Sequence, residues 1–126
     1  MESGKVILLV DDDLTLREMY DERLKAEGFD IIQASNGDEA MRKAKESKPN
    51  IILLDIMMPK VNGFDVLKQL KADSDLKDIP VIVLTALIQD VDRVQGKKLG
   101  AVDYIVKSET MPGEVIAKIK NAMGER

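Results

Sequence analysis

The chain has 126 residues, a net charge of −4, and neither cysteine nor histidine, which excludes disulfides, thiolate metal sites and an imidazole base. With 44% hydrophobic and 33% charged residues, it has the balance of a soluble globular protein, and the mild acidity disfavours direct binding of nucleic acid. No apolar stretch is long enough to span a membrane and no leader is evident, so we expect a single cytoplasmic domain over residues 1–126.

Short apolar runs rich in valine and isoleucine are predicted to be strands. In chain order they are Val6–Val10, Ile31–Ala34, Ile51–Leu54, Val81–Leu84 and Val102–Val106. Because most of them are almost continuously apolar, they are typical of strands that are buried on both faces.

Segments with the apolar spacing of helices follow the strands. The residues expected to mark their buried faces are Leu16, Met19, Tyr20 and Leu24; Ala40 and Ala44; Phe64, Leu67 and Leu70; Val91 and Val94; and Val115, Ile119 and Met123. Gly28 suits the end of the first helix, Asn36 and Glu39 suit a capping box before the second, and Pro112 suits the first turn of the fifth. The fourth helix is predicted to be the weakest, since it has few apolar anchors and contains Gly96.

The alternation of strand and helix predicts an α/β fold, a doubly wound five-stranded parallel sheet with five helices on its two faces. With the strand order 2-1-3-4-5, the first and third strands are neighbours at the switch point of the sheet. Ligands of such sheets bind there, beyond the carboxyl ends of the strands.

Acidic residues follow the two strands that meet at this point. Asp11 and Asp12 come directly after the first strand, and Asp55 comes directly after the third. Adjacent strands lie about 5 Å apart, so these carboxylates are expected to face one another and to repel unless a cation is present. Mg²⁺ prefers such oxygen ligands, which predicts a magnesium site. Asp13, by contrast, suits the cap of the first helix.

The remaining two strands deliver a hydroxyl and an ammonium to the same edge. Thr85 ends the fourth strand, and Lys107 follows the fifth. Together with carboxylates and Mg²⁺, these groups suit the transfer of a phosphoryl group to an aspartate, because the metal and Lys107 neutralise phosphate oxygens while Thr85 donates a hydrogen bond.

Four stretches carry a resemblance that covers essentially the whole chain: LLVDDD, LLDIMMPKVNGFDVLKQLK, DIPVIVLTA and GAVDYIVK. In this order and spacing they resemble the receiver domain of two-component response regulators. The resemblance implies that Asp55 is phosphorylated and that Asp11, Asp12, Asp55 and the backbone carbonyl of Met57 hold Mg²⁺, with Mn²⁺ as a substitute.

The resemblance also implies a switch. Thr85 and Lys107 would contact the phosphoryl group, Tyr104 would reorient, and the face of the fourth helix, fifth strand and fifth helix would signal to a protein target. The implied phosphodonor is a sensor histidine kinase or a phosphotransfer protein. The protein is then expected to be a phosphoacceptor rather than an enzyme acting on other substrates. We expect it to contact neither nucleic acid nor a membrane, and to be either a monomer or a dimer that forms on phosphorylation.

Two alternatives use the same chain differently. Asp11-x-Asp13-Leu14-Thr15 fits the nucleophile motif of haloacid-dehalogenase-like phosphatases, with Asp11 as nucleophile and Asp13 as acid–base, but the later Gly-Asp-x-x-x-Asp motif is missing. A flavodoxin-like flavin protein would need a Ser/Thr-rich phosphate loop after the first strand, and acids stand there instead.

Departures from the family pattern give two further predictions. Ser108 stands where a proline usually follows the lysine, which predicts either a trans bond with a shifted loop or a strained cis bond, since cis costs about 3 kcal/mol before a non-proline residue. Met57 and Leu87 are apolar at the variable positions beside the site, and neither can align an attacking water. We therefore expect a long-lived acyl phosphate.

Elsewhere the chain keeps the family pattern, since the stretch from Pro59 to Gly63 matches the loop that follows the phosphorylated strand.

Overall fold

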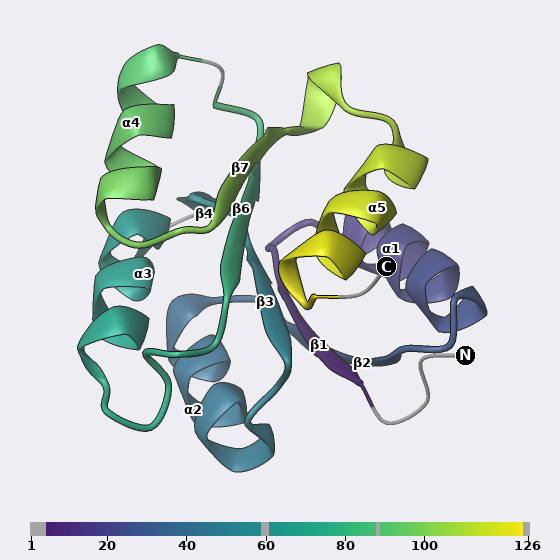
Figure 1. The fold of residues 1–126 in the computed structure, drawn as a ribbon, viewed down its shortest axis with the longest axis horizontal. Coiled ribbons are helices and arrows are strands. Elements are labelled where there is room, and N and C mark those ends of the chain that lie inside the picture. Colours follow the sequence, from purple (N-terminus) through teal and green to yellow (C-terminus); the bar gives the residue numbers. More distant parts are fainter. Residues whose placement is uncertain (1–4, 59–60, 88, 125–126) are drawn as a thin grey trace.

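The computed structural model describes residues 5–58, 61–87 and 89–124, so Pro59 of the predicted loop motif lies outside the described residues. Strands and helices alternate along the chain (Figure 1). The elements are β1 (Val6–Val10), α1 (Leu14–Ala26), β2 (Asp30–Ala34), α2 (Gly37–Ser47), β3 (Ile51–Leu54), β4 (Met57–Met58), β5 (Val61–Asn62), α3 (Gly63–Ala72), β6 (Val81–Thr85), α4 (Asp90–Lys98), β7 (Asp103–Val106), the 3₁₀ turn η1 (Lys107–Glu109) and α5 (Pro112–Ala122).

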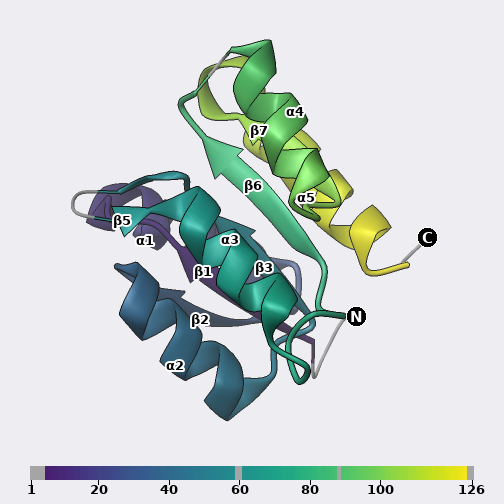
Figure 2. The ribbon, with the colours of Figure 1, turned by 90° about the vertical axis from the view of Figure 1, so that its left-hand side faces the viewer.

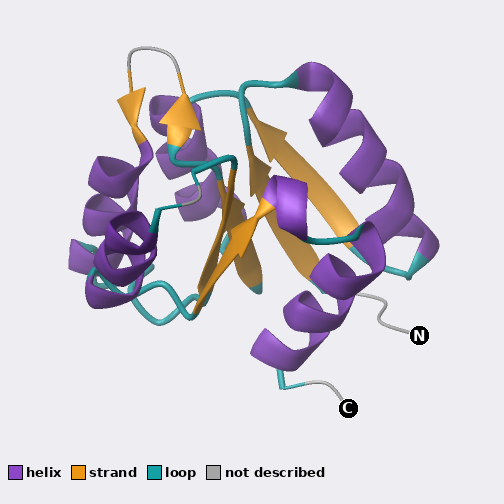
Figure 3. Ribbon diagram, turned by 90° about the horizontal axis from the view of Figure 1, so that it is seen from above, coloured by secondary structure: helices purple, strands orange, loops and turns teal. Residues whose placement is uncertain are grey.

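The central sheet has the predicted topology. Its five strands are all parallel and lie in the order β2-β1-β3-β6-β7, which is the expected 2-1-3-4-5 arrangement of the main strands. Figure 3 shows the sheet between two groups of helices, and Figure 1 places α2, α3 and α4 on one face and α1 and α5 on the other. The fold is therefore a doubly wound α/β sheet.

Each face of the sheet has its own hydrophobic core, because successive residues of a strand point to opposite faces. In β1, Leu8 and Val10 pack toward α2 and α3, while Ile7 and Leu9 pack toward α1 and α5. The predicted helix anchors are mostly confirmed: Tyr20, Leu24, Ala40, Ala44, Phe64, Leu67, Leu70, Val115 and Ile119 are buried, and Leu16, Met19 and Met123 are partly buried against the core.

The prediction for α4 was wrong about its buried face. Val91 and Val94 are 65% and 63% exposed, and among the residues of α4, all of which the structure describes, Gly96 is the buried one. A Cβ at Gly96 would lie 3.0 Å from Cδ2 of Tyr104, so the helix backbone itself packs against β7. Two valines three positions apart show that a helix has an apolar face, but they do not show that this face meets the core.

The ends of the helices follow local side-chain chemistry. Asp13 caps α1, as expected, by accepting a hydrogen bond from the Leu16 N–H at 3.2 Å. Asn36 caps α2 through the Glu39 N–H at 2.9 Å, while the Glu39 carboxylate accepts from the Ser35 N–H rather than from Asn36 as in a standard capping box. Gly28 adopts a φ of 97°, a left-handed conformation that favours glycine after a helix.

A small antiparallel pair was not expected. Strands β4 and β5 pair Met57 with Asn62 and Met58 with Val61, beside the end of β3. None of the helices in the described part of the chain has the length and apolar character needed to cross a bilayer.

Candidate functional site

The register of the sheet brings Asp11 and Asp55 to the same edge. Val10, the last residue of β1, pairs with Leu54, the last residue of β3, and the Asp55 N–H donates to the Val10 carbonyl at 2.9 Å. Each aspartate is therefore the first residue beyond its strand. The prediction that these acids lie close together at the switch point is confirmed.

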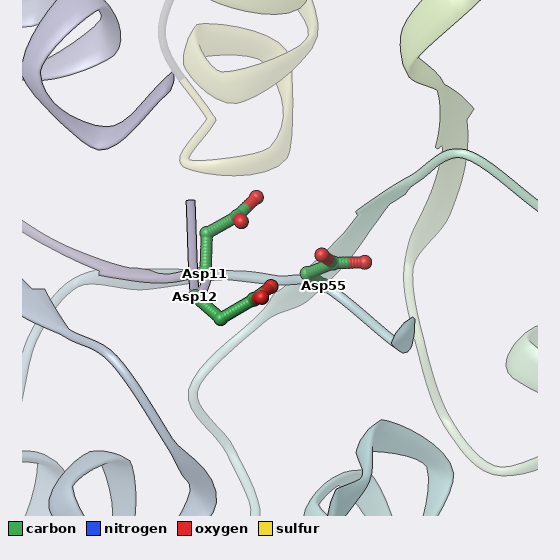
Figure 4. A group of neighbouring side chains, drawn as sticks. All are labelled: Asp11, Asp12 and Asp55. Carbon is green, nitrogen blue, oxygen red and sulfur yellow. The ribbon is translucent and has the colours of Figure 1, made fainter. Parts of the chain in front are cut away.

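Three carboxylates form one cluster there. Oxygens of Asp11, Asp12 and Asp55 all lie within 4.8 Å of one another, and Figure 4 shows the side chains gathered where β1 and β3 end. Asp11 and Asp55 are only 1% and 4% exposed, whereas Asp12 is exposed. Two members of the cluster are therefore buried, and solvent reaches the cluster at Asp12.

The ammonium of Lys107 joins the buried pair. Its Nζ lies 2.7 Å from Asp11 Oδ2 and 3.3 Å from Asp55 Oδ2. Burial lowers the pKa of Lys107, but the hydrogen bonds and charges of the two aspartates outweigh it, so that the net pKa is raised. One ammonium cannot neutralise three carboxylates, so the cluster retains an excess of negative charge.

The buried, negatively charged surroundings of Asp11 raise the pKa of its carboxyl group. Burial raises its pKa, and this effect outweighs the hydrogen bonds that the carboxylate accepts from Lys107 and from the Asp13 N–H. The neighbouring charge of Asp55 raises the pKa further. A cation placed among these oxygens would favour the ionised form.

The donor set suits a hard divalent cation. Carboxylate oxygens are the ligands that Mg²⁺ prefers, and one exposed member leaves room for water and phosphate oxygens. The Met57 N–H donates to Asp55 Oδ1 at 3.0 Å and holds this carboxylate in place, while the Met57 side chain is 54% exposed. The Met57 carbonyl as a metal ligand stays a prediction.

Thr85 lies at the neighbouring strand ends and is fully buried. It pairs with Val106 across β6 and β7, and Lys107 is the next residue of the chain. The Thr85 hydroxyl accepts a hydrogen bond from the Leu87 N–H at 3.4 Å. The predicted gathering of hydroxyl, ammonium and carboxylates at one edge therefore extends over β1, β3, β6 and β7.

Tyr104 is packed inside the molecule. Its ring is 2% exposed, its hydroxyl donates to the Leu87 carbonyl at 3.2 Å, and the Arg93 guanidinium lies 5.4 Å from the ring centroid. Burial, followed by the charge of Asp92, raises the pKa of Tyr104 to about 12. Tyr104 thus contacts both the loop that follows Thr85, the last residue of β6, and helix α4.

Two residues that support the site were not predicted from the sequence. Arg17 donates a short hydrogen bond from Nη1 to the Asp11 carbonyl and another from Nε to Gln33 Oε1 at 3.0 Å, which ties the end of β1 to α1 and β2. The second is the role of Gly63: a Cβ there would lie 2.5 Å from the Asp55 carbonyl oxygen and against Ile56 Cα. The glycine permits α3 to begin directly against the backbone that carries Asp55.

The bond between Lys107 and Ser108 is trans, as no cis peptide bond occurs among the described residues. The chain turns at once into η1, Lys107–Glu109, which leads toward α5. This outcome excludes the strained cis form that the sequence left open. The predicted shift of the loop relative to the family stays a prediction.

Comparisons with known proteins agree with this geometry. Residues 7–120 match the model of the response regulator receiver domain. The chain is 42% identical over 117 residues to the probable transcriptional regulator ycf27 of Porphyridium aerugineum, which covers 93% of this chain and 47% of that protein. It is 46% identical over 114 residues to the CpxR homologue of Haemophilus influenzae, covering 90% of this chain and 48% of that protein.

A solved structure has the same fold. The chemotaxis protein CheY4 of Vibrio cholerae superposes with a TM-score of 0.87 at 28% identity, covering 94% of this chain and 98% of that one. The chain spans about half the length of the curated relatives it matches. These matches give no support to the haloacid-dehalogenase-like alternative. The chain belongs to the response regulator receiver domain family.

Proposed function

We propose that residues 1–126 form one receiver domain that accepts a phosphoryl group on Asp55 and passes the signal to a protein target. The phosphodonor is the phosphohistidine of a sensor histidine kinase or phosphotransfer protein, and the reaction takes place in the cytoplasm. The observation that carries the proposal is the cluster of Asp11, Asp12 and Asp55 within 4.8 Å, with Lys107 bound to both buried members. Three clustered carboxylates beside a single ammonium are the groups expected of a site that binds a divalent cation and a phosphoryl group.

The residues of the chain have distinct tasks in this reaction. A carboxylate oxygen of Asp55 attacks the phosphorus, and the bond from phosphorus to the donor imidazole nitrogen breaks with its electron pair on that nitrogen. Asp11, Asp12, Asp55 and the Met57 carbonyl would hold Mg²⁺, or Mn²⁺ in its place. When bound, this ion supplies positive charge for the phosphoryl oxygens.

Lys107 supplies a second positive charge from its position beside Asp55, 3.3 Å from Oδ2. Thr85 carries the hydroxyl that is available to hydrogen-bond a phosphoryl oxygen. Hydrolysis of the Asp55 phosphate returns the chain to its starting form, so the only reactions it promotes are its own phosphorylation and dephosphorylation. It therefore acts as a switch rather than as an enzyme with external substrates.

Phosphorylation is read at the edge formed by α4, β7 and α5. Thr85 would move toward the phosphoryl group, and Tyr104 and α4 would respond, since Tyr104 contacts the loop after Thr85. Changing the ratio of active to inactive conformations from 1:99 to 99:1 requires the phosphoryl group to favour the active conformation by about 5.5 kcal/mol, so we expect a partial shift of the population. The domain is either a monomer or a dimer that forms on phosphorylation. The acidic domain itself makes no direct contact with nucleic acid.

Incubation with Mg²⁺ and acetyl phosphate tests the proposal by intact mass spectrometry. Wild type should gain a single phosphoryl group, and Asp55→Asn should gain none. Asp13→Asn is the matched control, because asparagine preserves the helix cap and Asp13 is not part of the cluster. Continuous turnover of p-nitrophenyl phosphate that survives Asp55→Asn and disappears in Asp11→Asn would favour the phosphatase instead.

A further inference from the structure

A groove between α3 and α4 is built from residues outside the phosphorylation site, although it shares helix α4 with the proposed signalling edge. It has a volume of about 420 Å³ and is lined by Lys68, Val91, Val94, Gln95, Lys98 and Leu99. Figures 1 and 2 place α3 and α4 on the same face of the sheet, opposite α5. Neither the acceptor reaction nor the switch described above uses these side chains.

The groove is apolar because of the way α4 meets the sheet. Gly96 faces Tyr104, and Val94 lies about 160° around the helix from Gly96, so the valine points away from the core. Val91, Val94, Gln95 and Lys98 have the spacing of one helix face. Two valines that are 65% and 63% exposed on adjacent turns make an apolar surface with no partner among the described residues.

The charge of the groove differs from that of the whole chain. The protein carries 23 acidic and 19 basic residues, yet the charged residues that line the groove in the described part of the chain are two lysines, Lys68 and Lys98. Lys68 is only loosely paired, with its Nζ 3.9 Å from Asp65 Oδ1. Lys98 has no ion pair or hydrogen bond among the residues that the structure describes. Both ammonium groups are available to an incoming carboxylate.

We propose that this groove is a docking site for an acidic amphipathic helix of another protein. Apolar side chains of that helix would rest on Val91, Val94 and Leu99, and its carboxylates would pair with Lys68 and Lys98, in the manner of helix-in-groove recognition. Because the nine residues of α4 extend over about 13 Å, the site engages two to three turns of the partner. A second copy of the chain fits poorly, since a two-fold contact would place the lysines of one groove near those of the other.

The test is selection from a displayed library of 16-residue helical peptides, randomised among apolar, acidic, basic and amide residues, against the unphosphorylated protein. The selected peptides should be acidic on the flanks of an apolar stripe, and amide signals of α4 and α3 should shift on binding in NMR spectra. Val91→Ser combined with Val94→Ser should weaken their binding by about tenfold or more, and Lys98→Glu by about threefold or more.

Matched variants on the same helix and the same surface type provide the controls. Lys97→Glu makes the same charge change one position away from the groove, and Val102→Ser removes another exposed valine. Each should alter binding by less than about twofold. Serine and valine have similar helix propensities, and circular dichroism verifies that α4 is retained.

Three results would overturn the proposal. One is a selection that yields basic or uncharged peptides, or none. Another is a set of binders whose affinity is unchanged by the groove substitutions. The third is a concentration-dependent dimer in sedimentation that disappears in the Val91→Ser, Val94→Ser variant, which would make a second copy the occupant. None of these results depends on phosphorylation of Asp55, so failure here and failure of the proposed function are separable.

Discussion

Gly63 is the position where a single methyl group should disturb both the fold and the site. It is the first residue of α3, and its N–H donates to the Ile56 carbonyl at 3.0 Å. In Gly63→Ala the new Cβ would lie 2.5 Å from the Asp55 carbonyl oxygen and against Ile56 Cα. Both contacts are with backbone, so no change of side-chain rotamer relieves them, and the segment that carries Asp55 has to move.

The magnitude follows from two opposing effects. Overpacking of a tight position costs about 1–3 kcal/mol, and contacts with backbone place this case in the upper half of that range. Alanine is favoured over glycine in a helix by up to about 1 kcal/mol, which offsets part of the cost. We expect the free energy of unfolding to fall by about 1–3 kcal/mol.

Gly113→Ala is the matched control. Gly113 also lies in the first turn of a helix, α5, but a Cβ there would meet nothing within 4 Å. This substitution should leave the free energy of unfolding unchanged or raise it by about 0.5–1 kcal/mol, because the unfolded chain loses freedom.

Urea unfolding followed by circular dichroism measures both variants, with the slope against urea as a check that the unfolding remains two-state. Phosphorylation by acetyl phosphate should also slow in Gly63→Ala, because the Asp55 carboxylate is displaced. Equal stabilities of the two alanine variants would refute the argument that α3 begins against the Asp55 backbone.

The remaining predictions concern the charges and the switch. Lys107→Met removes the ammonium that pairs with Asp11 and Asp55, the same carboxylates that would hold the metal. Mg²⁺ should therefore bind severalfold more tightly in calorimetry while phosphorylation slows; weaker Mg²⁺ binding would contradict this competition. The pKa of Tyr104, raised from 10.0 to about 12, means that the folded state disfavours the phenolate. The corresponding stability is therefore complete below pH 10 and is lost as the pH rises through about 12. Because burial also raises the pKa of Tyr20, the other tyrosine of the chain, phenolate absorbance should show two late-titrating groups in wild type and one in Tyr104→Phe. Ordinary titration of the group that is lost in Tyr104→Phe would exclude the buried position. The phosphoryl group on Asp55 should be long-lived, and Met57→Asn or Leu87→Glu should accelerate its loss by about tenfold; decay unchanged by both substitutions, as in a Val102→Asn control, would defeat this expectation.

Much of the architecture was predictable because most of the main strands are almost continuously apolar and end at, or directly before, a polar residue. The convergence of Asp11 and Asp55 required that β1 and β3 be parallel neighbours, which follows from the strand order 2-1-3-4-5, one of the few doubly wound orders that the alternation of strand and helix allows. The pairing of Thr85 with Val106, one residue before Lys107, follows from the same topology.

Other features depend on three-dimensional contacts that leave no periodic pattern. The two-residue strands β4 and β5 are too short to give an alternating signal. The burial of Gly96 rather than Val91 and Val94 is decided by the fit of α4 to Tyr104, which lies on another element. The hydrogen bond from Arg17 to the Asp11 carbonyl depends on the path of the chain between β1 and α1.

Paramagnetic broadening of amide NMR signals by Mn²⁺ tests the central claim, that the carboxylates beyond β1 and β3 form one cation site beside Asp55. At substoichiometric Mn²⁺ the signals of Asp11, Asp12, Asp55 and Met57 should broaden first, and excess Mg²⁺ should restore them. The effect should be lost in Asp11→Asn and retained in Asp13→Asn. Broadening that is centred elsewhere, or that persists in Asp11→Asn, would contradict the account.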